Sequence, residues 1–280
     1  FTNKGRVHRK KGYQIPEAGR TAKGTNLVNV LPIEQDEKVT AMIHLREFPE
    51  DRYLVMVTRT GTVKRIQLSS IFTARKAGIR AITLEEGDEL ITVRETDGEQ
   101  AILIVTHDGM AICFKETDVR CMGRDACGVR GIKLREGDYV IGAARAKHDH
   151  QVLMVTENGY GKRTDMDEYI RADGPQNRGG YGLKGYNVTE KTGPVVGVKV
   201  VSDADDILVI NDAGVIIRMA VSGISTYGRA AQGVKLMNLD EGVKVISFAR
   251  TDHEEEEPDQ EGENSNTDAS VSTPSDSAVE

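Results

Sequence analysis

The stretch QVLMVTENGYGKR (residues 151–163) contains the pattern that decides the fold. An apolar, β-branched run is followed by a polar pair and a glycine, and a second run continues beyond them. Glycine tolerates positive φ in a tight turn, so this order of residues is a β-hairpin signature. The segment therefore predicts two antiparallel strands joined by a turn at Gly159.

The hairpin pattern recurs along the chain at a near-constant spacing of roughly 50 residues, which is typical of repeat architectures. The turn glycines are Gly5, Gly61, Gly109, Gly159 and Gly214. A second glycine-containing element follows each hairpin, and its anchor glycines are Gly24, Gly78, Gly128, Gly182 and Gly233. Another apolar strand, such as DELITVRE, closes each unit. Each unit thus holds about four short strands, the size of a propeller blade.

Five units of nearly equal length favour a ring over a β-sandwich, because a sandwich does not require regular repetition. Closure also removes exposed sheet edges, which would otherwise template aggregation. The last strand, VKVISFAR (243–250), has no hairpin after it, and we expect it to share a blade with residues 1–11. The expected fold is all-β: a closed, propeller-like ring of four-stranded blades with five visible repeats.

Charge divides the chain into a body, residues 1–250, and a tail, residues 251–280. The tail carries eleven acidic and no basic residues, which leaves the body with 37 basic and 33 acidic residues although the whole chain has a net charge of −7. The tail is also almost free of large apolar residues, so it is predicted to be disordered. A basic body with an acidic tail suggests binding to a polyanion.

Basic residues recur at fixed positions in the repeats and are the candidate DNA contacts. Four places before the anchor glycine lie Arg20, Arg124, Arg178 and Arg229. Two places after it lie Arg80, Arg130, Lys184 and Lys235. Beyond the hairpin glycine lie Arg9, Lys64, Arg65, Lys162, Arg163 and Arg218. Cations at a constant spacing around a ring would neutralise phosphates along a curved track. The same residues could instead pair with the acidic turns and hold the blades together, and the sequence does not decide between these roles.

No catalytic or metal-binding motif stands out. Residues 180–185 fit G-x-G-x-x-G but lack the flanking strand and helix of a nucleotide site. Tyr53, after Arg52, leads into an apolar strand, and the histidines His107, His148 and His150 show no metal-ligand spacing. The cysteines Cys113, Cys121 and Cys127 are odd in number and form no C-x-x-C pair, which favours reduced thiols in a cytoplasm.

Three segments resemble the C-terminal domain of the bacterial DNA gyrase A protein. They are NLVNVLPIEQDEKVTAMI (26–43), CMGRDACGVRGIKLREGD (121–138) and TENGYGKRTDMDEY (156–169). The corresponding domain of topoisomerase IV ranks second in resemblance. The resemblance covers residues 1 to about 250, and the first residues, which lack an initiator Met, suggest a fragment of a longer protein. The family's hallmark glycine-rich box is missing, and residues 176–182 are interpreted as a degenerate repeat copy instead.

The resemblance implies a β-pinwheel, usually of six blades, that wraps duplex DNA around its basic perimeter without sequence preference. It implies a non-catalytic fragment of a type IIA topoisomerase, nucleoid-associated in the cytoplasm, whose holoenzyme introduces negative supercoils. The implied partners are the upstream breakage-reunion domain and the gyrase B protein in an A2B2 assembly. The fragment itself is expected to need no cofactor, with ATP and Mg used elsewhere in the holoenzyme. The alternative is a propeller scaffold that binds proteins and has little DNA affinity.

Overall fold

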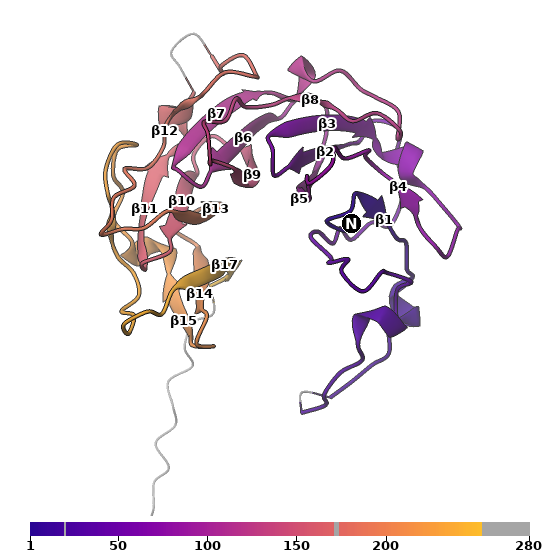
Figure 1. Cartoon of the computed structure of the whole chain (residues 1–280), viewed down its shortest axis with the longest axis horizontal. Helices are drawn as coiled ribbons and strands as arrows, with labels where there is room; N and C mark the ends of the chain where they lie inside the picture. The colour runs from indigo at the N-terminus through magenta and orange to yellow at the C-terminus, as the bar shows by residue number, and fades with distance from the viewer. Residues whose placement is uncertain (20, 171–173, 254–280) are drawn as a thin grey trace, which may run out of the picture.

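The computed structural model describes residues 1–19, 21–170 and 174–253, and in this part the chain forms an arc of β-sheets (Figure 1). The strands are β1 (Arg6–Val7), β2 (Tyr53–Thr58), β3 (Thr62–Gln67), β4 (Ile79–Arg80), β5 (Leu90–Thr96), β6 (Ala101–Thr106), β7 (Met110–Lys115), β8 (Val129–Arg130), β9 (Val140–Ala146), β10 (Gln151–Thr156), β11 (Tyr160–Asp165), β12 (Leu183–Lys184), β13 (Val195–Val201), β14 (Asp205–Asn211), β15 (Ile216–Ala220), β16 (Val234–Lys235) and β17 (Val245–Asp252).

The helical elements in the described ranges are single 3₁₀ turns. They are η1 (Gly12–Gln14), η2 (Leu27–Asn29), η3 (Leu68–Ile71), η4 (Glu116–Asp118), η5 (Met166–Tyr169) and η6 (Val221–Gly223). Within residues 1–19, 21–170 and 174–253, no helix has the length and apolar character needed to cross a bilayer.

The expected hairpins are present, but the sheets are assembled differently from the sequence units. Three sheets have four strands, in the orders β5-β2-β3-β8, β9-β6-β7-β12 and β13-β10-β11-β16. The outermost strand of each sheet comes from the anchor element of the following unit in the sequence. Each blade is therefore completed by its neighbour, and the expectation that one consecutive repeat unit forms one whole blade is wrong. This exchange ties adjacent blades together by backbone hydrogen bonds.

The anchor glycine is required because the donated strand approaches its acceptor closely. Gly128 precedes β8 and has a φ of +113°. A Cβ atom at this position would lie 2.7 Å from the carbonyl oxygen of Val63, in the acceptor strand β3. Val129 and Arg130 then pair with Val63 and Thr62. Any side chain at Gly128 would both strain the backbone and separate the two strands.

The hydrophobic cores lie between consecutive sheets. Successive residues of β2 belong to different cores, because Leu54 and Met56 pack on one face while Val55 and Val57 pack on the other. Strands β6 and β10 divide their side chains between two cores in the same way. This burial on both faces explains why the strand sequences are continuous apolar runs and do not alternate with polar residues.

The ring is not closed in the described part of the chain, as Figure 1 shows. Strand β17 pairs with β14, and β1 pairs with β4, so the expectation that the last strand shares a blade with residues 1–11 is wrong. The sheet β17-β14-β15 has three strands, and among the described residues no fourth strand covers β15. Strand β17 is the inner end strand of its own sheet, as β5, β9 and β13 are of theirs.

The boundary between body and tail also differs from the expected one. Thr251 and Asp252 belong to β17 and pair with Asp206 and Asp205 of β14. The folded body therefore extends at least to residue 252, beyond the expected limit at residue 250. Residues 254–280, which make up most of the expected disordered tail, lie outside the described residues.

Candidate nucleic-acid interface

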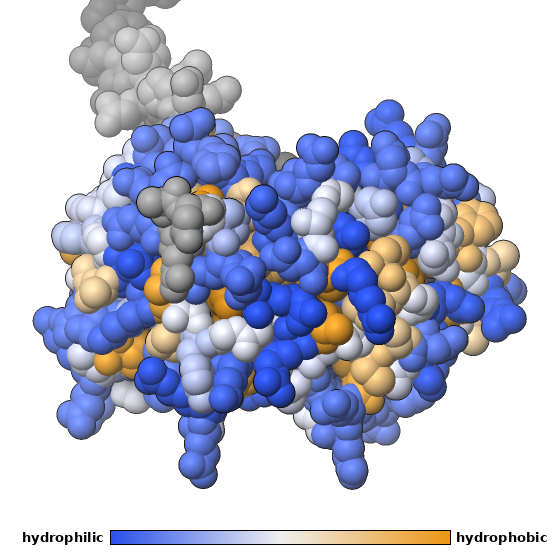
Figure 2. Space-filling model, turned by 90° about the horizontal axis from the view of Figure 1, so that it is seen from above, coloured by the Kyte–Doolittle hydropathy of each residue, from blue (hydrophilic) through white to orange (hydrophobic). Residues whose placement is uncertain are grey.

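The outermost strands present one exposed cation each. Arg80, Arg130, Lys184 and Lys235 occupy the second position of β4, β8, β12 and β16, and all four side chains are exposed. The residue before each of them is less exposed, as expected when consecutive side chains of a strand point to opposite faces. In the following text these four residues are called the rim cations. Figure 2, which views the arc from above, shows a largely hydrophilic surface with smaller apolar areas within it.

The rim cations are free to meet an anion. No ion pair joins any of them to a carboxylate within the part of the chain that the structure describes. Lys184 donates a hydrogen bond of 2.6 Å from its Nζ to the Oδ1 atom of Asn187, which leaves its charge uncompensated. The interpretation that these residues only pair with the acidic turns is therefore not supported for this set.

The carboxylates of the acidic turns accept hydrogen bonds from the hairpin backbone and do not pair with the rim cations. Asp88 accepts hydrogen bonds from the backbone N–H groups of Thr60 and Glu89 at 3.0 and 2.8 Å. Asp138 does the same for Asp108 and Tyr139 at 3.0 and 2.8 Å. These carboxylates bind the backbone at the base of the hairpin and do not neutralise the rim.

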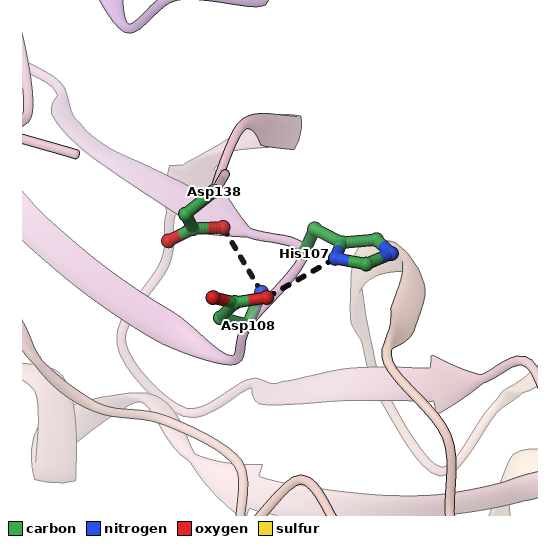
Figure 3. A group of neighbouring side chains, drawn as sticks. All are labelled: His107, Asp108 and Asp138. Carbon is green, nitrogen blue, oxygen red and sulfur yellow. Dashed lines mark hydrogen bonds and ion pairs between the residues drawn. The ribbon is translucent and has the colours of Figure 1, made fainter. Parts of the chain in front are cut away.

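Figure 3 shows the one grouping within the described residues whose ligand atoms could approach a metal ion: His107, Asp108 and Asp138. The Nδ1 atom of His107 lies 3.1 Å from Asp108. The carboxylate of Asp138 already accepts the two backbone hydrogen bonds described above. Asp88 makes the equivalent bonds in the preceding unit without a histidine beside it, so the geometry fits a hairpin clamp better than a metal centre.

The arginines before the anchor glycine lie on the connecting loops and are half-buried where the structure describes them. Arg178 reaches back to the preceding blade and donates to the carbonyl oxygens of Asp118 and Arg130 at 2.9 and 3.0 Å. The guanidinium of Arg229 lies 3.9 Å from Glu168. Arg124 is half-buried without an ion pair among the described residues. Arg20 lies outside the described residues.

Lys64 and Lys162, which we expected to contact DNA, are fully buried, each at 0% exposure. The Nζ atom of Lys64 donates to the carbonyl oxygens of Ala81, Arg124 and Ala126 at 2.8, 2.6 and 2.9 Å. Burial lowers the pKa of Lys64 to about 8. This ammonium group cannot reach a phosphate in this conformation, which contradicts the expected role. It holds the backbone of the loop that carries Arg124.

Lys162 makes the equivalent contacts two blades further on. Its Nζ atom donates to the carbonyl oxygens of Gly228 and Arg229 at 2.7 and 2.5 Å, and burial lowers its pKa to about 8 as well. Each lysine thus lies three places after a hairpin glycine and secures the loop that precedes the anchor glycine of the following unit, Gly128 or Gly233. We refer to Lys64 and Lys162 as the clamp lysines.

The remaining hairpin cations are also engaged within the protein. Arg163, 7% exposed, forms an ion pair with Asp203 and donates to the carbonyl oxygen of Ile224. Arg65 lies 4.7 Å from the ring centre of Tyr53 and 3.8 Å from Glu116. Arg218 pairs with Asp206 at 2.8 Å. For these arginines the structural interpretation describes the observed contacts better than DNA binding does.

Arg9 differs, because it is exposed and borders a basic pocket that sequence reasoning missed. Its guanidinium lies 4.6 Å from the ring centre of Phe72. A pocket of about 520 Å³ is lined by Arg9, Lys10, Lys11, Arg75 and Lys76, and no carboxylate is among its lining residues. The signal in the sequence is the two short basic runs at 9–11 and 75–76, which do not recur at the repeat positions. We call these five residues the basic pocket.

The comparisons with known proteins agree with the repeat architecture. A family described as the DNA gyrase C-terminal domain, beta-propeller, matches residues 1–45, 52–97, 100–147, 150–202 and 205–252. The chain is 52% identical over 257 residues to the DNA gyrase A protein of Clostridium acetobutylicum, covering 92% of this chain and 30% of that protein. It is 50% identical over 261 residues to the DNA gyrase A protein of Halalkalibacterium halodurans, covering 93% and 31%. The chain thus spans about a third of the length of these relatives.

Two solved structures share the fold. The C-terminal domain of DNA topoisomerase IV superposes with a TM-score of 0.82 at 27% identity, covering 90% of this chain and 78% of that one. The DNA gyrase A C-terminal domain superposes with a TM-score of 0.76 at 26% identity, covering 89% and 80%. The matched segments follow the five repeats, and both of the relatives described above are gyrase A proteins. The chain belongs to the family of DNA gyrase C-terminal, propeller-like domains.

Proposed function

We propose that this domain binds duplex DNA on its outer rim and bends it, without sequence preference. The observation that supports the proposal is the repetition of an exposed, uncompensated cation on the strands β4, β8, β12 and β16. Bending 20–30 bp by 40–90° costs on the order of 1–6 kcal/mol. Several phosphate contacts distributed along a convex surface offset that cost, since each releases condensed counterions. The basic pocket extends the track next to Arg80 at the N-terminal end of the arc.

In the longer protein, the proposed role is to deliver DNA to an ATP-dependent topoisomerase that introduces negative supercoils. That role involves the upstream breakage-reunion domain, the gyrase B protein in an A2B2 assembly, and the cytoplasm as the compartment. ATP and Mg would act in those other parts and not in this domain. The family membership and the gyrase A relatives support this assignment.

The test is DNA binding by a variant that lacks the rim cations, R80A/R130A/K184A/K235A. Each lost phosphate contact weakens binding, so we expect at least a tenfold loss of affinity for a random-sequence duplex at low salt. The control is K38A/R46A/K115A/K147A, which removes the same number of charges from exposed positions outside the outermost strands. Equal losses in the two variants would contradict a rim track. Weak binding by the unaltered domain at low salt would favour the protein scaffold.

The ring is proposed to be completed by one further unit of the longer protein. In the four-stranded sheets, the two residues after an anchor glycine pair with the two residues after the hairpin glycine of the preceding unit. The pairing is antiparallel, so the first residue of each pair lies opposite the second residue of the other. Gly24 has a φ of +72° like the other anchors, yet nothing lies within 4 Å of its missing Cβ. Val215 and Ile216, at the other end of the arc, are 50% and 59% exposed, whereas Val63 in a covered blade is 0% exposed. The hairpin of an added unit would pair with residues 25–26. The strand after the anchor glycine of that unit would pair with β15.

Hydrogen exchange tests this completion. We expect the amides of residues 25–26, and those amides of β15 that do not bond β14, to exchange rapidly in this chain. They should become protected in a protein extended upstream by about 50 residues, because new strand pairing covers both edges. If protection instead appears in this chain as its concentration rises, the free ends pair between copies and the proposed sixth unit is wrong.

A further inference from the structure

The inner strands surround a cavity at the centre of the arc. Strands β5, β9, β13 and β17 are at the inner end of their sheets, and Figure 1 shows them on the concave side. A cavity of about 320 Å³ is lined by residues of all four strands and by residues 40–42. It is separate from the rim, since none of the rim cations lines it. Its size is at the lower end of the range for sites that bind small molecules.

Two cations line this cavity at equivalent positions of alternate blades. Arg94 of β5 lies opposite Val55, and Lys199 of β13 lies opposite Leu153. Val55 and Leu153 each lie six places before a hairpin glycine, so the two cations occupy equivalent positions. The same position is Ala144 in the intervening blade. Arg94 and Lys199 line the same cavity, and Arg94 acts electrostatically on Lys199, so the two charges lie within range of one another.

No carboxylate lines the cavity to balance this charge. Arg94 makes one side-chain hydrogen bond, of 3.3 Å, to the carbonyl oxygen of Val93, and Lys199 has no hydrogen-bonding or ionic partner among the described residues. Burial lowers the pKa of both groups, and neighbouring cations lower each pKa further: Arg145 for Arg94, and Arg94 and Arg250 for Lys199. Desolvated like charges without a counter-ion are unfavourable, and a bound anion would relieve the repulsion.

The two neighbouring cations are already engaged at the edge of this cluster. Arg250 lies 3.7 Å from the carboxylate of Asp205. Arg145 donates a hydrogen bond of 3.3 Å to the carbonyl oxygen of Glu95. Arg94 and Lys199 therefore remain as the pair available to a ligand inside the cavity.

We infer that the central cavity is a binding site for a small multivalent oxyanion of the phosphate or pyrophosphate class, held by Arg94 and Lys199. The planar guanidinium group binds two oxygens of a phosphate at once, and the ammonium group adds a compact charge. The site is independent of the proposed DNA track, because it uses different strands and lies at the opposite end of each sheet.

The experiment uses the full chain, no DNA, and pyrophosphate as the probe. A ligand that binds only the folded state stabilises it by mass action, so we expect a saturable rise in Tm of about 5 °C or more at a hundredfold excess over Kd. Sulfate at the same ionic strength controls for general salt effects. The variant R94Q/K199Q should lose the shift, while K115Q/K147Q, with the same charge change at exposed positions outside the rim and the cavity, should keep it.

A shift of equal size in all three proteins, or no saturable shift in the unaltered chain, would overturn the proposal. If R94Q/K199Q does not fold, the single variant K199Q takes its place, since Lys199 is only half-buried and we expect a shorter polar side chain there to disturb the packing less. Calorimetric titration with pyrophosphate then gives the stoichiometry, which should be one anion per chain. Loss of DNA binding in the rim variants would leave this result unchanged, so the two proposals can fail separately.

Discussion

Lys162 and Lys184 are both repeated cations on successive strands of the chain, yet they lie in opposite environments. Lys162 extends from β11, the third strand of its sheet, and is covered by the loop before β16. Lys184 extends from β12, the outermost strand of the preceding sheet, and is exposed. The comparison teaches that a cation's place in the strand order, and not its recurrence in the sequence, decides whether it can bind a ligand.

The two roles are complementary. The clamp lysines fix the loops that carry Arg124 and Arg229, and those loops lead directly into the strands that present the rim cations. A buried ammonium group is an effective clamp, because its three N–H donors can satisfy carbonyl groups that would otherwise be buried without partners. The rim itself needs the opposite property, namely charge that remains in solvent until a phosphate arrives.

The largest expected effect is on stability. Replacing Lys162 with methionine keeps most of the apolar stem but leaves the carbonyl groups of Gly228 and Arg229 without their donor. We expect the free energy of unfolding to fall by about 3 kcal/mol, measured by urea denaturation. The matched variant Lys184→Met, at an exposed position, should change it by no more than about 0.5 kcal/mol. Similar losses in both variants would show that burial does not separate the two lysines.

Much of this fold follows from local sequence patterns. Each hairpin is encoded within one short stretch, such as residues 151–163, because the turn glycine and the two flanking runs are adjacent. The anchor glycines were also recognisable, since a repeated glycine before a short strand indicates a backbone constraint. The exchange of outer strands was not predictable in this way. Val129 pairs with Val63 of the preceding unit, and no local pattern specifies a partner so distant in the chain.

The site was only partly predictable for the same reason. The rim cations could be chosen because they recur two places after an anchor glycine, and the structure places them on exposed outer strands. The clamp lysines recur equally well, and the sequence does not show that a later loop covers them. The basic pocket joins Lys10 and Lys11 to Arg75 and Lys76, which are brought together only by the pairing of β1 with β4.

The smaller expected effect concerns the salt dependence of DNA binding, and it distinguishes a direct contact from an indirect one. If Lys184 contacts a phosphate, Lys184→Ala removes one released counterion, and the slope of log K against log salt should become shallower by about 0.9. Lys162→Met should also weaken binding, because the loop that carries Arg229 loses its fixed position. Its loss should be uniform across salt concentrations, with an unchanged slope, since no phosphate contact disappears with the clamp. Titrations of the unaltered domain and both variants with one duplex, from about 50 to 200 mM salt, measure the three slopes. A shallower slope for Lys162→Met would show that its ammonium group reaches DNA after all, and that the loop above it opens when DNA binds.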